Sequence, residues 1–445
     1  MAVTQGTLTF RTGGVHPPEA KERTSGRPLE ASSPPAEVAV LMAQHIGAPA
    51  RAVVNKKDRV RKGQIVGEAA GYISANMHAP VSGTVRAVEE RVYSVTGALV
   101  PAVVIENDGQ EKWARGLNEP QDVEAMDAGR MVELVQECGV VGLGGATFPA
   151  HVKLKPPADS PILDAFVNGA ECEPFVTVDH RLMLERTADV VDGLRLIMRI
   201  VGAPSGWIGI EENKPDAIEA FAELLADEPD VRIVPLRVRY PQGAEQQLIT
   251  AVTGREVPSG GLPSDVGCLV HNVATALAVR DAVRFRRPLI ERALTVTGDG
   301  IERAGNFIER IGTNVGDILR RQGVREGANQ LILGGPMMGI AQGTAEVPLL
   351  KGNNALIVRR DASVPPQRDC IRCGRCVEHC PLGLMPGELS IACEAKDWDA
   401  ALRLNILDCK ECGCCAYVCP ARRQIVQMVK WGKAELRRRK QRQGK

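Results

Sequence analysis

Eight of the thirteen cysteines form a tight, repeated pattern near the C-terminus, and this pattern constrains the chain more than any other feature. They form two runs of the same design: three cysteines, each pair separated by two residues, and then, after three more residues, a Cys-Pro dipeptide. Spacing this tight and repeated is typical of metal ligands and not of the disulfides of a small secreted protein. The two runs are Cys370, Cys373, Cys376 and Cys380 before Pro381, and Cys409, Cys412, Cys415 and Cys419 before Pro420.

The repeated run is the signature of bacterial ferredoxins that hold two [4Fe-4S] clusters. Three thiolates at these gaps can hold one face of a cluster, while the fourth, on the turn before proline, reaches the other cluster. We therefore predict crossed ligation by two sets: Cys370, Cys373 and Cys376 with Cys419, and Cys409, Cys412 and Cys415 with Cys380. Zinc is the alternative, but zinc ribbons use pairs of ligands and not two triplets that each precede Cys-Pro. The other five cysteines, Cys414 among them, are predicted to be bystanders.

Charge and hydropathy exclude several classes of partner. Lys and Arg number 55 against 54 Asp and Glu, so no overall field favours nucleic acid, and none is predicted as a partner. The longest nearly uncharged stretch, residues 266–279, is shorter than the roughly 20 apolar residues of a spanning helix. The N-terminus has no apolar stretch behind a basic start, so we expect a chain that stays in the cytoplasm.

Patterning predicts a multidomain α/β and α+β protein. Residues 1–120 are rich in Gly, Pro and Val in short strands, and they resemble a barrel-sandwich hybrid of the lipoyl or biotinyl type. Asn76 and Met77 stand where such a domain has its carrier lysine, so no swinging arm is predicted. Residues 121–289 alternate strands with long helices, which predicts a Rossmann-like α/β domain. Residues 290–360 resemble the soluble ligand-binding β-grasp domain, 361–428 form the ferredoxin-type helical domain, and 429–445 are a basic tail.

A glycine-rich segment follows the first helix expected in the α/β domain. Four glycines fall within residues 139–145, and Lys153 follows. Backbone N–H groups in such a loop can approach a phosphate, and a nearby lysine adds positive charge. The segment lacks the Gly-Lys-Ser/Thr of a Walker loop, and Thr147 stands where the last glycine of G-x-G-x-x-G would be. On its own, a tight turn between packed elements explains the glycines equally well.

Four segments, in the same order, resemble the FMN- and NADH-binding subunit of respiratory complex I: residues 142–154, 168–174, 240–245 and 271–275. The resemblance implies an FMN phosphate site, an FMN-lining set and a set that meets NAD(H). It also implies catalytic roles for Glu171 and Glu173, which follow an apolar strand where α/β domains bind ligands. A solvated loop is the alternative for these carboxylates. The three sets are Gly142, Gly144, Gly145 and Lys153; then Asn168, Glu171, Gly243, Asn272 and Thr275; then Phe148, Glu173 and Glu245.

The chain also resembles the RnfC family of the Rnf electron-transport complex over nearly its whole length, through residues 13–22, 44–50, 168–186, 210–218, 334–339 and 369–381. This resemblance implies a peripheral subunit on the cytoplasmic side of the cell membrane that carries FMN, NAD(H) and two [4Fe-4S] clusters. Its partners would be membrane subunits, which couple electron transfer between ferredoxin and NAD+ to Na+ or H+ translocation. Ferredoxin would be an indirect partner, through the complex.

Two alternatives stay open. One is a cobalamin reductase of diol-metabolising microcompartments, although that family typically begins at the nucleotide domain. The other is an electron-transfer scaffold with no working nucleotide site, because the complex I subunit has acids where this chain has Ala170 and Ala244.

The C-terminal segment, residues 430–445, carries eight basic residues against one acid, Glu435. Such a run is often a solvated, partly disordered tail. The alternative is a segment that docks on an anionic membrane surface or on an acidic patch of a membrane partner, with about 1 kcal/mol from each basic side chain near the surface.

Overall fold

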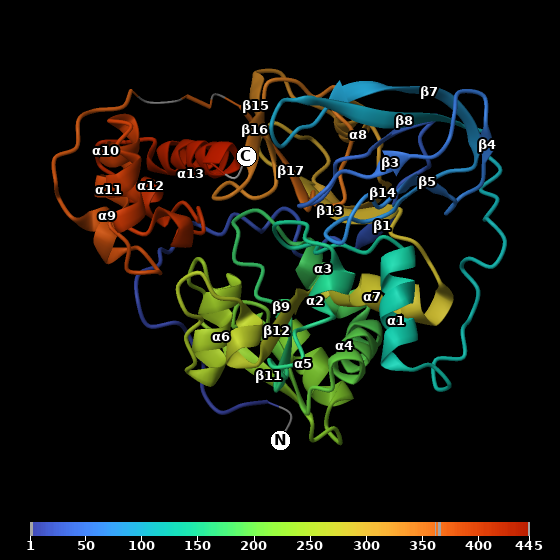
Figure 1. Ribbon diagram of the computed structural model, residues 1–445, viewed down its shortest axis with the longest axis horizontal. Helices are drawn as coiled ribbons and strands as arrows, with labels where there is room; N and C mark the ends of the chain where they lie inside the picture. Colours follow the sequence, from blue (N-terminus) through green and yellow to red (C-terminus); the bar gives the residue numbers. More distant parts are fainter. Residues whose placement is uncertain (1–2, 361, 364–365, 444–445) are drawn as a thin grey trace.

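Four β-sheets and a C-terminal group of helices make up the part of the chain that the computed structural model describes, residues 3–360, 362–363 and 366–443 (Figure 1). The sheets have four, four, three and six strands. The sites predicted from the sequence lie on or between these units, so each unit is described by what it positions.

A parallel four-stranded sheet with the order β11-β10-β9-β12 forms the centre of the α/β unit. Both of its faces are apolar. Ala165 and Val167 of β9 pack toward α4 and α7, while Phe166 packs on the opposite face with Leu248 of α6. Burial on both faces is typical of parallel sheets covered by helices. The elements are β9 (Asp164–Gly169), β10 (Ser205–Glu211), β11 (Val231–Leu236), β12 (Cys268–Asn272), α1 (Ala128–Glu137), α2 (Ala150–Lys153), α3 (Val178–Glu185), α4 (Thr187–Val201), α5 (Pro215–Leu224), α6 (Glu245–Thr253), η1 (Pro263–Val266) and α7 (Val273–Phe285).

Two small antiparallel sheets enclose a separate apolar core built from residues 38–105. Met77 is fully buried in this core, and the Asn76 side chain donates a hydrogen bond of 3.2 Å to the carbonyl of Glu137 in α1. The hairpin that would carry a lysine in a lipoyl domain is therefore packed against the α/β unit. The strands are β2 (Glu37–Leu41), β8 (Leu99–Asn107), β7 (Gly83–Val92) and β4 (Arg59–Val60) in one sheet, and β3 (Arg51–Ala52), β5 (Ile65–Glu68) and β6 (Met77–His78) in the other.

The six-stranded sheet has the order β1-β14-β13-β17-β15-β16 and carries helix α8 on one face. Val296, Phe307 and Ile318 form part of the core between this sheet and α8. The turn between β15 and β16 contains residues 334–339, which reach toward the α/β unit. The elements are β1 (Leu29–Ala31), β13 (Glu291–Thr297), β14 (Gly305–Arg310), α8 (Val315–Gln322), β15 (Ala328–Leu333), β16 (Ile340–Gln342) and β17 (Ala355–Arg360).

Residues 3–31, here called the N-terminal strap, run along other units before the first barrel strand, β2, begins at Glu37 (Figure 1). Val3 and Leu8 bridge to β11, Val15 bridges to Tyr240, and β1 then pairs in parallel with β14. The strap thus joins the parallel sheet to the six-stranded sheet. Because the pairing partners of the strap are more than 200 positions away, local sequence patterning does not predict its path.

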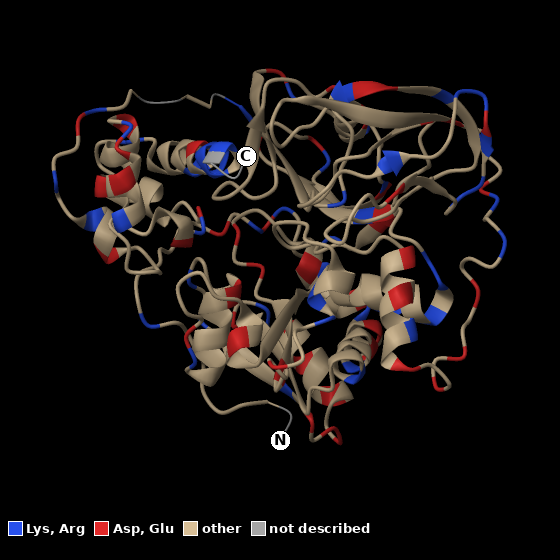
Figure 2. Cartoon of the chain, in the orientation of Figure 1, with Lys and Arg blue, Asp and Glu red and all other residues tan. Residues whose placement is uncertain are grey.

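The C-terminal helices pack around Leu389, Trp398, Ile406 and Val429. The last helix, α13, extends through most of the predicted basic tail, and its C-terminal part is coloured blue for Lys and Arg (Figure 2). No described helix combines the length and the apolar character needed to cross a bilayer. The elements are α9 (Arg375–Glu378), α10 (Pro386–Glu394), α11 (Trp398–Arg403), η2 (Ile406–Asp408), α12 (Cys414–Tyr417) and α13 (Ile425–Gln443).

Candidate functional site

The glycine-rich loop lies between α1 and α2 and is closed by a hydrogen bond of 2.8 Å from Gly142 N to Phe148 O. Its tip, Gly144 to Ala146, is exposed. Within the described residues, the N–H groups of this tip donate no hydrogen bond to the protein. Free donors on an exposed turn are what an anionic phosphate group binds.

The two central glycines of the loop have different surroundings. A Cβ added to Gly144 would lie 2.7 Å from Cβ of Asn272, whereas one added to Gly145 would meet nothing within 4 Å. Leu143 N donates to Oγ1 of Thr275 at 2.9 Å, and Asn272 caps the N-terminus of α7. The loop is therefore seated on the start of α7, and Gly145 stands open at the surface.

The other residues predicted to line the FMN meet at the carboxyl ends of β9 and β12. Asn168 and Asn272 are paired in register, and Asn168 Nδ2 donates to Gly243 O at 2.7 Å. Lys153 forms an ion pair with Glu245 and also donates to Val270 O at 2.7 Å. This edge of a parallel sheet is where α/β folds bind ligands.

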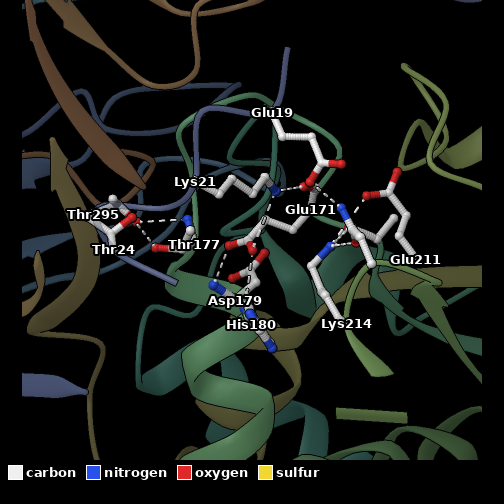
Figure 3. A network of polar contacts seen from close by, with 12 residues as sticks. Glu19, Lys21, Thr24, Glu171, Thr177, Asp179, His180, Glu211, Lys214 and Thr295 are labelled. Atoms are coloured by element: carbon white, nitrogen blue, oxygen red, sulfur yellow. Dashed lines mark hydrogen bonds and ion pairs between the residues drawn. The ribbon is translucent and has the colours of Figure 1, made fainter. Parts of the chain in front are cut away.

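Glu171 does not point freely into solvent (Figure 3). Its carboxylate accepts from Asp179 N at 2.6 Å and from His180 N at 3.3 Å, so it caps the start of α3. Burial raises the pKa of Glu171 to about 7, although the ammonium of Lys21, 3.9 Å away, opposes this shift. The carboxyl group therefore exchanges its proton near neutral pH.

Glu173 turns toward the six-stranded sheet. Its two oxygens accept from Met337 N at 3.0 Å and from Met338 N at 2.9 Å, in the turn between β15 and β16. A Cβ on Gly335 would lie 2.3 Å from this carboxylate, so glycine is required there. Burial raises the pKa of Glu173 to about 7 against the lowering effect of the two N–H bonds.

Sequence reasoning did not assign two lysines, the buried Lys214 and the partly buried Lys21, that hold the loop between β9 and α3 (Figure 3). Lys21 of the N-terminal strap donates to Glu171 O at 2.6 Å, and Lys214 donates to Ala170 O at 2.8 Å. Lys214 also lies 3.3 Å from the carboxylate of Glu211. Burial lowers the pKa of Lys21. The signal for these residues was present, because residues 13–22 and 210–218 belong to the segments that carry the family resemblance.

Three buried polar atoms, one each in α3, β10 and β12, have no hydrogen-bond partner among the described residues: Asp179 Oδ1, Glu211 Oε1 and His271 Nε2. Such atoms are costly unless a ligand or water bonds to them. Burial lowers the pKa of His271 to about 3, and Lys153 adds to this effect, so the imidazole is neutral. The free N–H groups of the glycine loop fit an anionic phosphate, while the unpaired carboxyl oxygens fit hydrogen-bond donors of a polar ligand.

Four cysteines of the second predicted set, Cys380, Cys409, Cys412 and Cys415, line one cavity between α10, α12 and α13. Among the described residues, no three His, Cys, Asp or Glu side chains are placed to hold a single metal ion. A four-iron cluster holds its thiolates farther apart than one ion does, so four thiols around one cavity fit a cluster. Cys414 lines the same cavity, and its Sγ lies 3.9 Å from Tyr240 O.

The first predicted set is more exposed. Burial raises the pKa of Cys376, and the thiols of Cys370 and Cys419 add to this effect because they lie nearby. Cys373 is exposed. The thiol that the crossed arrangement takes from the second run, Cys419, is thus a neighbour of the first run.

The second cysteine run contacts the α/β unit. Tyr240 Oη donates to Cys412 O at 2.7 Å, and Cys412 packs in one apolar cluster with Cys172 and Met337. The strap contributes a hydrogen bond of 3.0 Å from Gly14 N to His379 O. The predicted second cluster therefore lies next to the loop that contains Glu171 and Glu173.

Comparison with known proteins identifies the family. Residues 8–110 match the RnfC barrel sandwich hybrid domain, and residues 135–281 match the Nuo51 FMN-binding domain. The chain is 42% identical, over 96% of its length and 94% of the relative, to the C subunit of the proton-translocating ferredoxin:NAD(+) oxidoreductase complex of Clostridium ljungdahlii. The chain belongs to the RnfC family. A relative in Acetobacterium woodii, named as the C subunit of a Na(+)-translocating complex, is 42% identical over 96% of this chain and 97% of its own length. A relative in Rhodobacter capsulatus, named as the C subunit of an ion-translocating complex, is 41% identical over 97% of this chain and 84% of its own length.

The resemblance to the RnfC family is thereby confirmed, and so are the barrel-sandwich N-terminal domain and the complex I-like FMN-binding domain. In this RnfC protein, four of the segments that carried the resemblance meet at one place. Residues 13–22 supply Lys21, 168–186 supply Glu171 and Glu173, 210–218 supply Lys214, and 334–339 supply the N–H groups that bind Glu173. The RnfC pattern therefore marks a single site built from three structural units.

Proposed function

We propose that this RnfC protein passes electrons between NAD(H) and two [4Fe-4S] clusters through a noncovalent FMN, as a peripheral subunit of an ion-translocating ferredoxin:NAD+ oxidoreductase complex. The observation that carries the proposal is the contact between Tyr240 and Cys412. It joins the segment that resembles a flavin site to the cysteines that resemble a cluster site. A flavin accepts a hydride as two electrons and can release them singly, and [4Fe-4S] clusters accept one electron at a time.

In this proposal, the glycine loop and Lys153 hold the FMN phosphate. The free N–H groups of Gly144 and Gly145 bond its oxygens, and the ammonium of Lys153 adds charge. Asn168, Gly243, Asn272 and Thr275 form the wall at the carboxyl edge of the sheet, as the complex I resemblance implies. The half-buried ring of Phe148 and the carboxylate of Glu245, which is paired with Lys153, would meet the nucleotide.

Glu171 and Glu173 act chiefly by fixing neighbouring backbone segments. Glu171 fixes the start of α3 and shares its buried pocket with the ammonium of Lys21. Glu173 ties the same loop to residues 334–339. Because burial raises the pKa of each carboxyl group to about 7, either one can hold a proton at physiological pH, beside a site where hydride transfer changes the local charge.

The positions of the two cysteine sets indicate the order in which electrons pass between the clusters. The second set, with Cys380, lies against the α/β unit, and the first set, with Cys419, includes the exposed Cys373. We infer that the second set exchanges electrons with the flavin and the first set with a partner. The helical ferredoxin-type fold of residues 361–428 and the β-grasp identity of residues 290–360 belong to the same proposal. The proposal also includes the location on the cytoplasmic side of the membrane and the membrane subunits as partners.

The test is substitution of Cys380, because only crossed ligation couples it to the second run. In Cys380→Ala, we expect resonance spectra of the reduced protein to lose the cluster of Cys409, Cys412 and Cys415. The matched variant, Cys419→Ala, should lose the other cluster. If Cys380→Ala removes the cluster of the first run instead, the crossed arrangement is wrong. Stoichiometric zinc without acid-labile sulfide in the wild-type protein would contradict the cluster proposal itself.

A further inference from the structure

Lys433 is a buried cation on the face of α13 that lines the second cysteine cavity. Ile425, Val426 and Val429 of α13 line that cavity, and Lys433 follows one turn after Val429 on the same face. Only 9% of its side chain is exposed, whereas 44% of the Lys430 side chain is exposed one turn earlier. Burying an ammonium is unfavourable unless it is paired and hydrogen-bonded, so a specific role is expected.

The ammonium of Lys433 has two partners, and both lie in the second cysteine run. It donates to the carbonyl oxygen of Cys409 and, at 2.7 Å, to Oε1 of Glu411. Glu411 has a positive φ of 58°, and its N–H donates to Cys409 Sγ at 3.4 Å. Lys433 therefore holds the turn that presents the first thiol of this run, and its charge lies next to that thiol.

In the described part of the chain, the first run has no lysine bonded to it in this way. Among the hydrogen bonds of the described residues, no Lys or Arg side chain donates to Cys370, Cys373, Cys376 or Cys419. Arg372, which occupies the position of Glu411 in the first run, also has a positive φ and donates its N–H to Cys370 Sγ at 3.4 Å. The two runs thus share their turn geometry, and they differ in the lysine hydrogen-bonded to the turn of the second run.

We propose that Lys433 is a positioning residue that raises the reduction potential of the cluster held by Cys380, Cys409, Cys412 and Cys415. The inference rests on the proposed function, because it requires that cluster. Adding an electron to a cluster makes it more negative, and a cation nearby favours the reduced form, most strongly where little water screens the charge. Glu411 offsets part of this effect, so Lys433 and Glu411 act in opposite directions.

The experiment is a potentiometric titration of the full-length protein, monitored by electron paramagnetic resonance, in four variants. Lys433→Met keeps the length of the side chain and removes its charge. We expect one of the two titration steps to move to lower potential, with about a tenfold drop in the ratio of reduced to oxidised cluster at fixed potential, about 59 mV for one electron. Glu411→Gln should move the same step upward. Lys433→Arg should stay close to the wild type.

The matched control is Lys430→Met, which removes an exposed lysine that lies 4.0 Å from the same Glu411 carboxylate. It should shift the step much less than Lys433→Met. Equal shifts in both variants, or no shift in a Lys433→Met protein that keeps about eight iron atoms, would overturn the role of Lys433. If the wild-type protein assembles no cluster, the proposed function fails instead, so the two failures are distinguishable. Iron and sulfide contents show whether a variant has lost its cluster. If Lys433→Met has lost it, the upward shift of the reduction potential expected in Glu411→Gln still tests the charge effect.

Discussion

At the scale of single residues, Gly145 gives the cleanest test of the phosphate site. A Cβ at Gly145 meets no protein atom within 4 Å, so Gly145→Val should fold normally. The side chain would occupy the space above the free N–H groups, and we expect FMN affinity to fall at least about tenfold, which is about 1.4 kcal/mol. Fluorescence titration of the apoprotein with FMN measures this. Gly343→Val is the control, because Gly343 is also exposed, has nothing within 4 Å of its added Cβ and lies outside the predicted FMN site. Unchanged FMN affinity in Gly145→Val would contradict the loop assignment.

The raised pKa of Glu173 predicts a pH-dependent stability. Because the folded carboxyl group binds its proton more tightly than the unfolded one, its effect on stability is most favourable below pH 4.5 and is lost as the pH rises to about 7. Glu173→Gln removes this dependence. Relative to the variant, the wild type should therefore lose up to about 3 kcal/mol of stability between about pH 4.5 and 8. Thermal unfolding of both proteins across this range measures the difference, and parallel curves would show that the Glu173 carboxyl group is not buried as described.

These residues also show what sequence alone could establish. The spacing of the cysteines and the order of four short segments predicted the cluster ligands and the flavin-lining residues by position. They did not predict that the two carboxylates accept hydrogen bonds from backbone N–H groups. Those of Glu171 come from α3, and those of Glu173 come from the turn between β15 and β16, more than 160 positions away. Side-chain direction at the end of a strand depends on such distant partners. The roles of Glu171 and Glu173 toward NAD(H) remain predictions.

At the scale of elements, the N-terminal strap is part of the candidate site. Lys21 neutralises the pocket of Glu171, so Lys21→Met leaves a buried carboxylate without its partner. We expect a loss of about 3 kcal/mol at about pH 8 and a smaller loss at about pH 5, where Glu171 is protonated. Unfolding measurements at the two pH values test this. Lys56→Met, which changes an exposed lysine of the barrel, should have little effect at either pH. If Lys21→Met is as stable as the wild type at both pH values, Lys21 does not stabilise the Glu171 carboxylate as described.

The basic tail is a second element whose role can be tested. The described part of residues 430–445 is helical through residue 443, so the basic side chains are presented by α13 and not by an irregular segment. Lys433 in this helix is buried, and the truncation should therefore begin after Leu436. We expect the truncated protein to bind vesicles that contain anionic lipid more weakly in a sedimentation assay, with unchanged reduction of its flavin by NADH. Equal binding through the same salt washes would refute the docking role and leave shape-based contacts with other subunits.

At the scale of the whole molecule, the strap, the parallel sheet, the six-stranded sheet and the cysteine-bearing helices converge on the loop between β9 and α3. Alternating strands and helices predicted the α/β unit, because local hydrophobic periodicity reports it directly. The path of residues 3–31 could not be predicted in this way, since their partners are set by tertiary contacts. The convergence explains why segments far apart in the sequence carry the RnfC resemblance, and it makes one electron path through a single chain possible.

The most direct test of that path is an anaerobic titration of the purified protein, reconstituted with FMN, iron and sulfide, with NADH. We expect about eight iron atoms and one FMN in each chain. We also expect NADH to bleach the flavin absorbance and to produce the resonance signal of a reduced [4Fe-4S] cluster in the same sample. A protein that holds both cofactors and whose flavin and clusters stay oxidised in excess NADH would show that electrons do not pass from NADH through the flavin to the clusters. It would leave an electron-transfer scaffold without a working nucleotide site.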